Sequence, residues 1–324
     1  MRLLVLSAAD VHRLLPVEAG IAAMRAALLA LARGEVHQPL RTVIRPPGAE
    51  GLLGLMPAFR AGTVPALAVK AVAVYPGNAA HGRDAHQGVV LLLDGATGEP
   101  LALANASAVT AVRTAAVTAV ATDALARPDA TTLAIIGSGV QAHAHLPAIA
   151  AVRRLTRIRV AGRSLERSRA FALAQAVPVE ACATVREALD GADIVVTVTS
   201  AKAPVLTHDW LAPGAHVNAV GSSVPTAREL DTATVAAARV FVDRRESALT
   251  ESGDYLDAAR EAGLGPDHIR GELGEVLAGT VPGRTSDDEL TVFVSLGLAV
   301  EDLATVAELH RRATAEGAGT WVDF

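Results

Sequence analysis

TTLAIIGSGVQAHAH, residues 131–145, carries the strongest local fold signal of the chain. A short apolar run, Leu133–Ile136, is followed by Gly137-Ser138-Gly139 and then by apolar residues at helical spacing. This order predicts the strand, glycine turn and helix start of a dinucleotide-binding βα unit. Gly137 would permit the tight turn and Gly139 would let the backbone approach a pyrophosphate, whose charge the helix dipole favours. Ala142 replaces the third glycine of the pattern, and the alternative interpretation is an ordinary strand-to-helix turn.

The composition is that of a globular protein whose cores are built from alanine, valine and leucine. Of the 324 residues, 51% are hydrophobic and only 3% are aromatic, and this length predicts two domains. A net charge of −5 and the absence of a basic run argue against nucleic-acid binding. Cys182 is the sole cysteine, which excludes disulfides within the chain and cysteine-based zinc sites. Because neither a signal peptide nor an apolar run of about 18 residues is recognised, we expect a cytoplasmic protein without a membrane partner.

The first third of the sequence predicts two helices followed by several strands with short connections, an α+β pattern. Ser7 and Asp10 form a capping-box pattern at the start of a helix over 8–15, and a helix over 17–33 follows. The expected strands are 3–6, 41–45, 51–56 (closed by Pro57), 66–75, 89–94 and 101–104.

From residue 131 onward, strands and helices alternate in the manner of a doubly wound parallel sheet. A helix over 108–126, capped by Ser107, leads into this part. The expected strands are 132–136, 157–161, 179–181, 194–199, 216–220 and 240–242, followed by helices over 249–259, 273–278 and 290–312. We expect the last helix to pack back onto the first part. The sequence therefore predicts an α/β protein with a Rossmann-type domain over 116–294 and an α+β domain over 1–115 with 295–324.

The end of the second strand of the alternating part favours NADP(H) over NAD(H), which stays possible. NAD-binding proteins tend to place a carboxylate there, about 20 residues after the glycines, to bind the ribose 2′-hydroxyl. Here Arg163 and Ser164 follow the strand, and Arg167 comes one turn later. A guanidinium and a hydroxyl suit a 2′-phosphate, whereas the alternative is a solvated basic loop. At the ends of later strands, Thr199 and Val220 could line the nicotinamide.

Basic residues in apolar surroundings mark the first domain as the candidate substrate-binding domain. Lys70 lies inside the strand ALAVKAVAVY, where it is either buried against a partner or directed to solvent at a sheet edge. Arg41, Arg45 and Arg113 could grip a substrate carboxylate, although a surface role is equally open for each of them. The histidines show no metal-binding spacing, so we expect no metal site.

Eight short stretches together resemble the ornithine cyclodeaminase/mu-crystallin family, in the family's order and across nearly the whole chain. They are QPLRT (38–42), LMP (55–57), VK (69–70), TAVRTAA (110–116), IGSGVQA (136–142), PGAHVNAVG (213–221), ESGD (251–254) and SLG (295–297).

This resemblance implies a homodimer that joins sheets of the first domains, which would make residues 1–115 with 295–324 a substrate-binding and dimerisation domain. It implies that Arg41, Lys70 and Arg113 hold the substrate carboxylate near the nicotinamide, with Lys70 and Arg113 as the catalytic pair. The candidate cofactor-binding residues are, taken together, Thr114, Gly137, Gly139, Val140, Gln141, Arg163, Ser164, Arg167, Thr199, Val220 and Ser295.

Three departures from the family pattern point away from ornithine cyclisation. Ser223, a candidate substrate-binding residue, stands where ornithine cyclodeaminases have an aspartate that acts on the amine. Gly54 replaces a glutamate for the distal amine, and Arg163-Ser164 replaces the acid that binds NAD. With these three changes, the chain is more similar to the reductase branch of the family.

The leading hypothesis is therefore an NAD(P)H-dependent reductase of an imine or ketimine next to a carboxylate. The alternatives are an amino-acid cyclodeaminase with recycled NAD, an alanine-type amino-acid dehydrogenase, and a non-enzymatic protein that binds NADPH and a small ligand.

Overall fold

The computed structural model describes residues 2–82 and 84–324, which divide into two compact units. Unit 1 comprises Met1–Arg113 and Leu298–Phe324, and unit 2 comprises Thr114–Gly297. These boundaries differ by two or three residues from those expected above. A segment from each end of the chain therefore builds unit 1.

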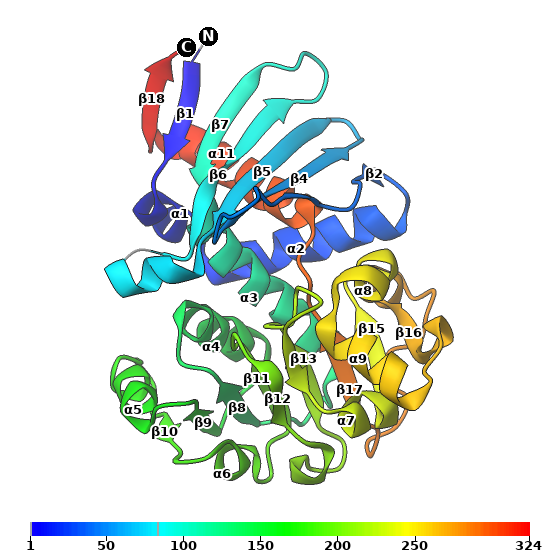
Figure 1. The fold of residues 1–324 in the computed structure, drawn as a ribbon. Coiled ribbons are helices and arrows are strands. Elements are labelled where there is room, and N and C mark those ends of the chain that lie inside the picture. The colour runs from blue at the N-terminus through cyan, green and yellow to red at the C-terminus, as the bar shows by residue number, and fades with distance from the viewer. Residues whose placement is uncertain (1, 83) are drawn as a thin grey trace. The chain divides into compact units, whose positions relative to one another are not determined.

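Unit 1 contains an eight-stranded sheet that is covered by helices on one face. The strand order is β18 (Thr320–Asp323), β1 (Arg2–Leu6), β7 (Pro100–Asn105), β6 (His86–Asp94), β5 (Ala66–Val74), β4 (Leu52–Arg60) and β2 (Val36–His37), and β3 (Thr42–Ile44) also pairs with β4. The chain termini meet in the antiparallel pair β1–β18, at one edge of this sheet (Figure 1).

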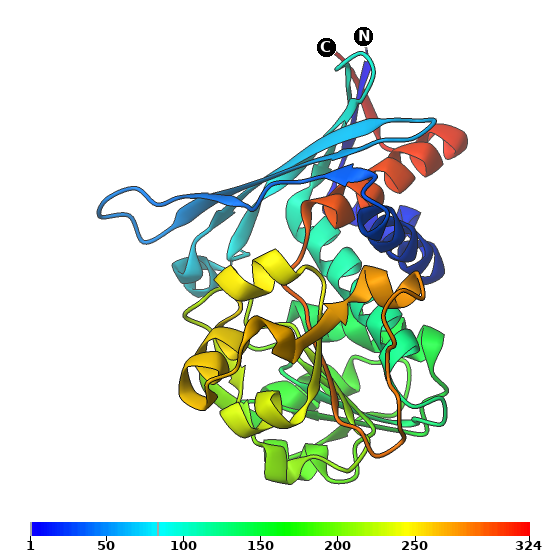
Figure 2. The same cartoon turned by 90° about the vertical axis from the view of Figure 1, so that its right-hand side faces the viewer.

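The covered face of this sheet forms the core of unit 1. Helix α11 (Ala299–Glu316) packs on β4, β5, β6 and β7, and α2 (Val17–Ala32) packs on α11. Helix α1 (Ala8–Leu14) lies on the same side of the sheet (Figure 2), and its expected capping box is present. Leu4, Leu92 and Leu309 are among the fully or almost fully buried side chains between these layers.

Unit 2 is built on an eight-stranded sheet in which every pair of neighbours is parallel. Its order is β10 (Glu180–Ala181), β9 (Arg157–Ala161), β8 (Thr132–Ile136), β11 (Ile194–Thr197), β13 (His216–Ala219), β17 (Thr291–Val294), β15 (Arg239–Val242) and β16 (Ile269–Glu272). The first strand of this sheet in sequence order, β8, lies between β9 and β11, so the strand order reverses direction beside it. This confirms the predicted doubly wound parallel sheet.

The remaining elements of unit 2 are short helices and a two-stranded ladder of β12 (Lys202–Leu206) with β14 (Arg228–Leu230). The α-helices are α4 (Val140–Val152), α5 (Leu165–Leu173), α6 (Val185–Leu189), α7 (Thr232–Ala237), α8 (Arg245–Glu251), α9 (Gly253–Ala262) and α10 (Leu273–Leu277). Single 3₁₀ turns are η1 (Pro76–His81) in unit 1 and η2 (His208–Trp210) and η3 (Pro266–His268) in unit 2.

Helix α3 (Ala106–Leu125) continues from unit 1 into unit 2. It is the one described helix that by itself is long and apolar enough to cross a membrane, but 78% of its apolar window is buried inside the protein. The helix therefore has the character of a core helix. Its expected cap is wrong: the helix begins at Ala106, and the Asn105 side chain accepts a hydrogen bond from the Ala108 amide at 2.9 Å. Ser107 instead donates its hydroxyl to the His86 carbonyl.

The expected end of the strand before Pro57 is wrong, because pairing between strands overrides the local pattern. Strand β4 continues through Pro57 to Arg60. On one side Pro57 pairs with Val69, and on the other it lies between the segments paired to β3 and β2, so its missing N–H interrupts no ladder there.

The expected helix 290–312 divides into a strand and a helix. Thr291–Val294 is the buried strand β17, held between β13 and β15, and the helix begins only at Ala299. An apolar run of this kind suits either structure, and the β-branched residues in it favour a buried parallel strand. From Ala299 onward the helix does pack onto unit 1, as expected. The single helix expected over 249–259 is likewise two helices, since Ser252 ends α8 and caps α9.

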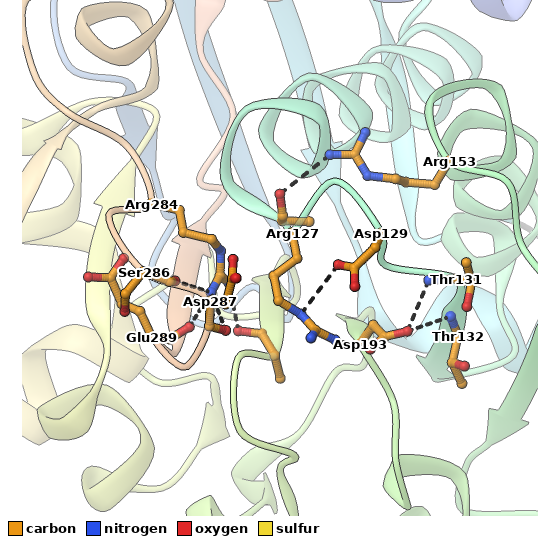
Figure 3. Close-up of polar contacts among 12 residues, drawn as sticks. Arg127, Asp129, Thr131, Thr132, Arg153, Asp193, Arg284, Ser286, Asp287 and Glu289 are labelled. Carbon is orange, nitrogen blue, oxygen red and sulfur yellow. Dashed lines mark hydrogen bonds and ion pairs between the residues drawn. The ribbon is translucent and has the colours of Figure 1, made fainter.

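Polar side chains tie together the amino ends of the central strands of unit 2 (Figure 3). Asp193, just before β11, accepts hydrogen bonds from the amides of Thr131 and Thr132, each at 2.9 Å, and pairs with Arg127. Arg284 donates to the carbonyls of Leu125 and Ala215 at 2.8 and 3.2 Å. This end of the sheet lies opposite the glycine turn that follows β8.

Candidate functional site

The glycine turn after β8 has the geometry of a dinucleotide-binding turn. Gly137 has a φ of +117°, and a Cβ there would lie 2.7 Å from the Val198 carbonyl oxygen, so only glycine fits. Gly139 is the N-cap of α4, and a Cβ there would meet no protein atom within 4 Å. The open space in front of Gly139 and the amides of the first helical turn form a cradle for an anionic group. These residues fit the pyrophosphate of a dinucleotide.

Basic and hydroxyl side chains follow the second strand of this unit. Arg163, two residues after the end of β9, is exposed, and Ser164 caps α5 by accepting a hydrogen bond from the Arg167 amide at 3.3 Å. No carboxylate occupies the strand end itself, since the next acidic residue, Glu166, is exposed in the first turn of α5. The end of β9 therefore offers an exposed guanidinium toward solvent.

Candidate nicotinamide contacts gather at the ends of the neighbouring strands β11, β13 and β17. Ser295 follows β17, and its amide donates to the Ala219 carbonyl at 2.9 Å. The Ser295 side chain is 3% exposed, and its Oγ has no hydrogen-bond partner among the described residues. Val220 is 9% exposed, and Thr199 is half-buried. A buried orphan hydroxyl is costly unless a ligand pairs with it, which fits a polar group of the cofactor.

The remaining candidate cofactor residues lie on two helices of unit 2. Val140 begins α4 and is 61% exposed, Gln141 follows it with a buried Oε1 that lacks a partner among the described residues, and Thr114 on α3 is buried. Ser223 is half-buried in the loop after β13. No group of three or more His, Cys, Asp or Glu side chains in the described parts of the chain is arranged to hold a metal ion.

A compact cluster of buried charges occupies unit 1. Lys70, Arg113, Glu301 and Asp302 are each at most 5% exposed. The Lys70 Nζ donates to Thr110 Oγ1 at 2.7 Å and lies 3.4 Å from Asp302 Oδ1. Arg113 donates its Nε to the same Asp302 oxygen at 3.2 Å and its Nη1 to Glu301 Oε2 at 2.8 Å. One aspartate oxygen therefore joins the two cations.

The local structure explains why these charges meet. In β5, Lys70 lies opposite Met56 and Val90, whose side chains belong to the buried, helix-covered face of the sheet. Arg113 lies on α3, and the first turn of α11 supplies both acidic residues. The alternative left open by the sequence is thus decided, because Lys70 is buried against partners.

The electrostatics of the cluster tune Lys70. Burial lowers the pKa of its ammonium to about 8, the charge of Asp302 opposes this fall, and the charges of Arg113 and Arg41 add to it. Lys70 therefore exchanges a proton close to neutral pH. Arg41 is half-buried just before β3, and its electrostatic effect on Lys70 places it in the same environment. Arg45 is exposed.

Thr110, Glu301 and Asp302 also belong to this cluster, and they were not predicted from the sequence. Thr110 opens the stretch TAVRTAA that already contains Arg113. Glu301 and Asp302 are adjacent acids inside a segment expected to be a largely buried helix. Buried acids require partners, so two adjacent acids in a buried helix indicate buried ion pairs. The sequence pattern does not identify the residues that pair with them.

Known proteins resemble this chain over both of its units. The model of the "Ornithine cyclodeaminase/mu-crystallin family" matches residues 1–317. Ketimine reductase mu-crystallin of Mus musculus is 43% identical over 270 residues, which span 83% of each protein. The solved structure of Thermococcus litoralis Delta(1)-pyrroline-2-carboxylate reductase in complex with NADH and L-proline is 36% identical, with a TM-score of 0.94 over 98% of this chain and 99% of that one. An archaeal alanine dehydrogenase dimer with bound NAD is 28% identical, with a TM-score of 0.93 over 100% of both chains.

Proposed function

Because the chain belongs to the ornithine cyclodeaminase/mu-crystallin family, we propose that it reduces the C=N bond of an imine or ketimine next to a carboxylate. The chain is an NAD(P)-dependent oxidoreductase of this bond type. Its relatives include a ketimine reductase and a reductase whose structure holds NADH and L-proline. In this chain, the observation that carries the proposal is the buried pair of Lys70 and Arg113 beside the half-buried Arg41.

For the substrate, we propose an imine with a single carboxylate, in preference to a dicarboxylate such as the imine of oxaloacetate. The support is the 36% identical reductase whose structure holds L-proline, an amino acid with one carboxylate.

The chain's own residues would bind, orient and protonate this substrate. Arg113 binds the carboxylate through its planar guanidinium, which fixes the plane of the C=N group. Lys70 donates a proton from Nζ to the imine nitrogen, and a pKa near 8 suits that transfer at neutral pH. The reduced nicotinamide, when bound, would supply the hydride for the imine carbon. One proton and one hydride convert C=N to CH–NH, and Lys70 recovers its proton from solvent.

For the cofactor, we propose NADPH rather than NADH. The support is the exposed Arg163 and the hydroxyl of Ser164 at the end of β9, where no carboxylate is present to favour an unmodified ribose. Arg167, one turn into α5, is also exposed and adds positive charge beside them.

We also propose a homodimer formed through the uncovered face of the unit 1 sheet. Side chains opposite the helix-covered face pair across β4, β5 and β6 and are apolar and only partly buried: Leu55, Pro57, Phe59, Leu67, Val69, Leu91 and Leu93. Leu67 is 37% exposed, and so is Val89 in the same face. A contiguous apolar face of this kind is typical of a protein–protein interface.

A substrate screen tests the proposed reaction. NADPH or NADH oxidation is followed with pyrroline-2-carboxylate, its six-membered cyclic homologue, α-keto acids plus ammonia or methylamine, and oxaloacetate plus ammonia. We expect turnover of the monocarboxylates and at least tenfold lower kcat/KM for the dicarboxylate. Ammonia release from ornithine or lysine with catalytic NAD, without turnover in the screen, would instead identify a cyclodeaminase. Tight cofactor binding without any turnover would identify a binding protein.

The dimer is tested separately by light scattering after size exclusion. The wild type should elute with the mass of two chains. Val89→Asp, which places a charge on the uncovered face, should shift the mass toward one chain, whereas a surface change in unit 2, Glu246→Gln on α8, should not.

A further inference from the structure

One buried carboxylate in unit 2 lies outside every set of residues discussed so far. Glu229, in β14, is fully buried and accepts three hydrogen bonds. Its Oε1 accepts from the Thr199 amide at 2.6 Å. Its Oε2 accepts from Thr197 Oγ1 and from the Gly221 amide, both at 2.7 Å. Both oxygens are thus engaged by donors that belong to other segments of the chain.

These donors belong to the carboxyl ends of two neighbouring strands. Thr197 ends β11 and Thr199 lies in the loop after it, while Gly221 lies in the loop after β13. The two strands are adjacent in the sheet, so one carboxylate joins the beginnings of both loops. A Cβ on Gly221 would lie 2.1 Å from the Thr199 carbonyl oxygen and 2.6 Å from Glu229 Cδ. The two loops therefore close tightly around this carboxylate, and only glycine permits that approach.

A second carboxylate holds Glu229 in place. Asp254, in the first turn of α9, is fully buried and accepts hydrogen bonds from the amides of Glu229 and Leu230 at 2.7 and 2.8 Å. Burial, reinforced by the charge of Asp254, raises the pKa of Glu229 to about 7. Arg228, whose side chain is 12% exposed, is the cation whose charge acts on Asp254. Burying two carboxylates to hold a loop is costly, since both must be desolvated. Such an arrangement calls for a function that apolar packing could not serve.

We propose that Glu229 is the positioning residue of the nicotinamide half of the cofactor site. It fixes the backbone of Thr199 and Gly221 and thereby sets the gap into which the nicotinamide end of the cofactor fits. In a doubly wound sheet, the glycine turn after β8 and the end of β9 take the pyrophosphate and the adenosine, which leaves the ends of β11 and β13 for the nicotinamide half. The orphan hydroxyl of Ser295 lies at this same end, beside Ala219. The inference rests on the proposed nicotinamide-dependent function.

Glu229→Gln tests this with two ligands that share one half of the cofactor. A carboxamide keeps one acceptor but turns an NH₂ group toward an N–H donor, so one of the two loops is released. The dissociation constant of NADPH or NADH, followed by its fluorescence without substrate, should rise about tenfold or more. That of the matching ADP-ribose, with or without the 2′-phosphate, should change less than about twofold. In the cofactor-free protein, amide exchange of peptides covering residues 197–201 and 219–223 should accelerate.

Asp193→Asn is the matched control. Asp193 is also a carboxylate that accepts two backbone amides of the same sheet, but at the amino ends of the strands. The Asp193→Asn substitution should lower the melting temperature and leave both dissociation constants unchanged. Thr197→Val, which removes one donor to Glu229 and keeps the side-chain volume, should give a smaller change in the same direction as Glu229→Gln.

Each outcome decides between the possibilities. If Glu229→Gln weakens the binding of the dinucleotide and of ADP-ribose equally, or changes neither, the carboxylate is merely structural. The same conclusion follows if Asp193→Asn weakens the binding of the dinucleotide as strongly. If Glu229→Gln does not fold, the ratio of the two dissociation constants in Thr197→Val decides instead. If the wild type binds neither NADPH nor NADH, the proposed function fails together with this inference, whereas normal wild-type binding with an unchanged ratio overturns this inference alone.

Discussion

Replacing Asp302 with asparagine should lower the alkaline limit of catalysis by more than one pH unit. Asp302 Oδ1 lies 3.4 Å from Lys70 Nζ, and its charge is the main opposition to the desolvation that brings the pKa of Lys70 down to about 8. An opposite charge at this distance typically shifts a pKa by roughly one to three units. Without that charge, the pKa of Lys70 should fall to roughly 6, while the amide oxygen can still accept the hydrogen bond.

The size of the effect follows from the protonated fraction of Lys70. At pH 7.5, a pKa of about 8 leaves roughly three quarters of Lys70 protonated, whereas a pKa of about 6 leaves roughly 3%. If Lys70 must be protonated to bind and reduce the imine, kcat/KM at pH 7.5 should fall about 25-fold. The loss should shrink as the pH is lowered toward 5.5, because Lys70 is then protonated in both proteins.

The assay is the pH profile of kcat/KM for imine reduction in the wild type and in Asp302→Asn. Glu301→Gln is the control, since Glu301 Oε2 pairs with Arg113, whereas Asp302 Oδ1 pairs with Lys70 as well as with Arg113. It should raise KM and leave the alkaline limb in place. An alkaline limb that stays at the wild-type position in Asp302→Asn, or one that moves equally in Glu301→Gln, would refute a proton-carrying role for Lys70.

Three further predictions concern the substrate, the cofactor and the stability of the fold. Arg113→Ala should reduce kcat/KM on the order of 10³-fold, since the buried guanidinium proposed to bind the carboxylate is lost, and near-normal kinetics would exclude that role. Arg163→Ala should raise KM for NADPH far more than KM for NADH, and equal increases would contradict the assignment of the 2′-phosphate site. Burial lowers the pKa of His145 to about 4 and, with Arg284 nearby, that of His216 to about 3, so both are neutral in the folded protein and bind protons more readily when unfolded. The contribution of these two groups to the free energy of unfolding is therefore fully present above about pH 6.5. The free energy of unfolding, measured with urea, should fall by roughly 2 kcal/mol for each histidine between pH 8 and pH 5. A flat pH profile would show that neither histidine contributes.

Local patterns were sufficient wherever the structure depends on neighbouring residues. The glycine turn at Gly137, the capping box of Ser7 and Asp10, and most strands of unit 2 follow from backbone stereochemistry and apolar spacing within a few residues. For the same reason, the change from α+β to alternating β and α was visible from residue 131 onward. The end of β9, with its arginine and missing carboxylate, also follows from sequence alone.

Contacts between distant segments decided the rest. Local sequence could not tell whether Thr291–Val294 would be helix or strand, and the pairing with β13 and β15 made it a strand. Pro57 continues a strand because of the register of β2 and β3 on its open side. Lys70 acquires its partner from α11, 232 residues away in the chain.

The sequence by itself determined the class of cofactor, the two-part organisation and the basic residues available to hold a carboxylate. Only the tertiary structure showed that Lys70 is buried, that Asp302 bridges it to Arg113, and that Glu229 joins the two strand ends. The physical reason is that the energy of a charge depends on its solvation and on its partners. Both are set by segments that meet only when the chain is folded, so the same lysine that was ambiguous in the sequence becomes a tuned acid in the structure.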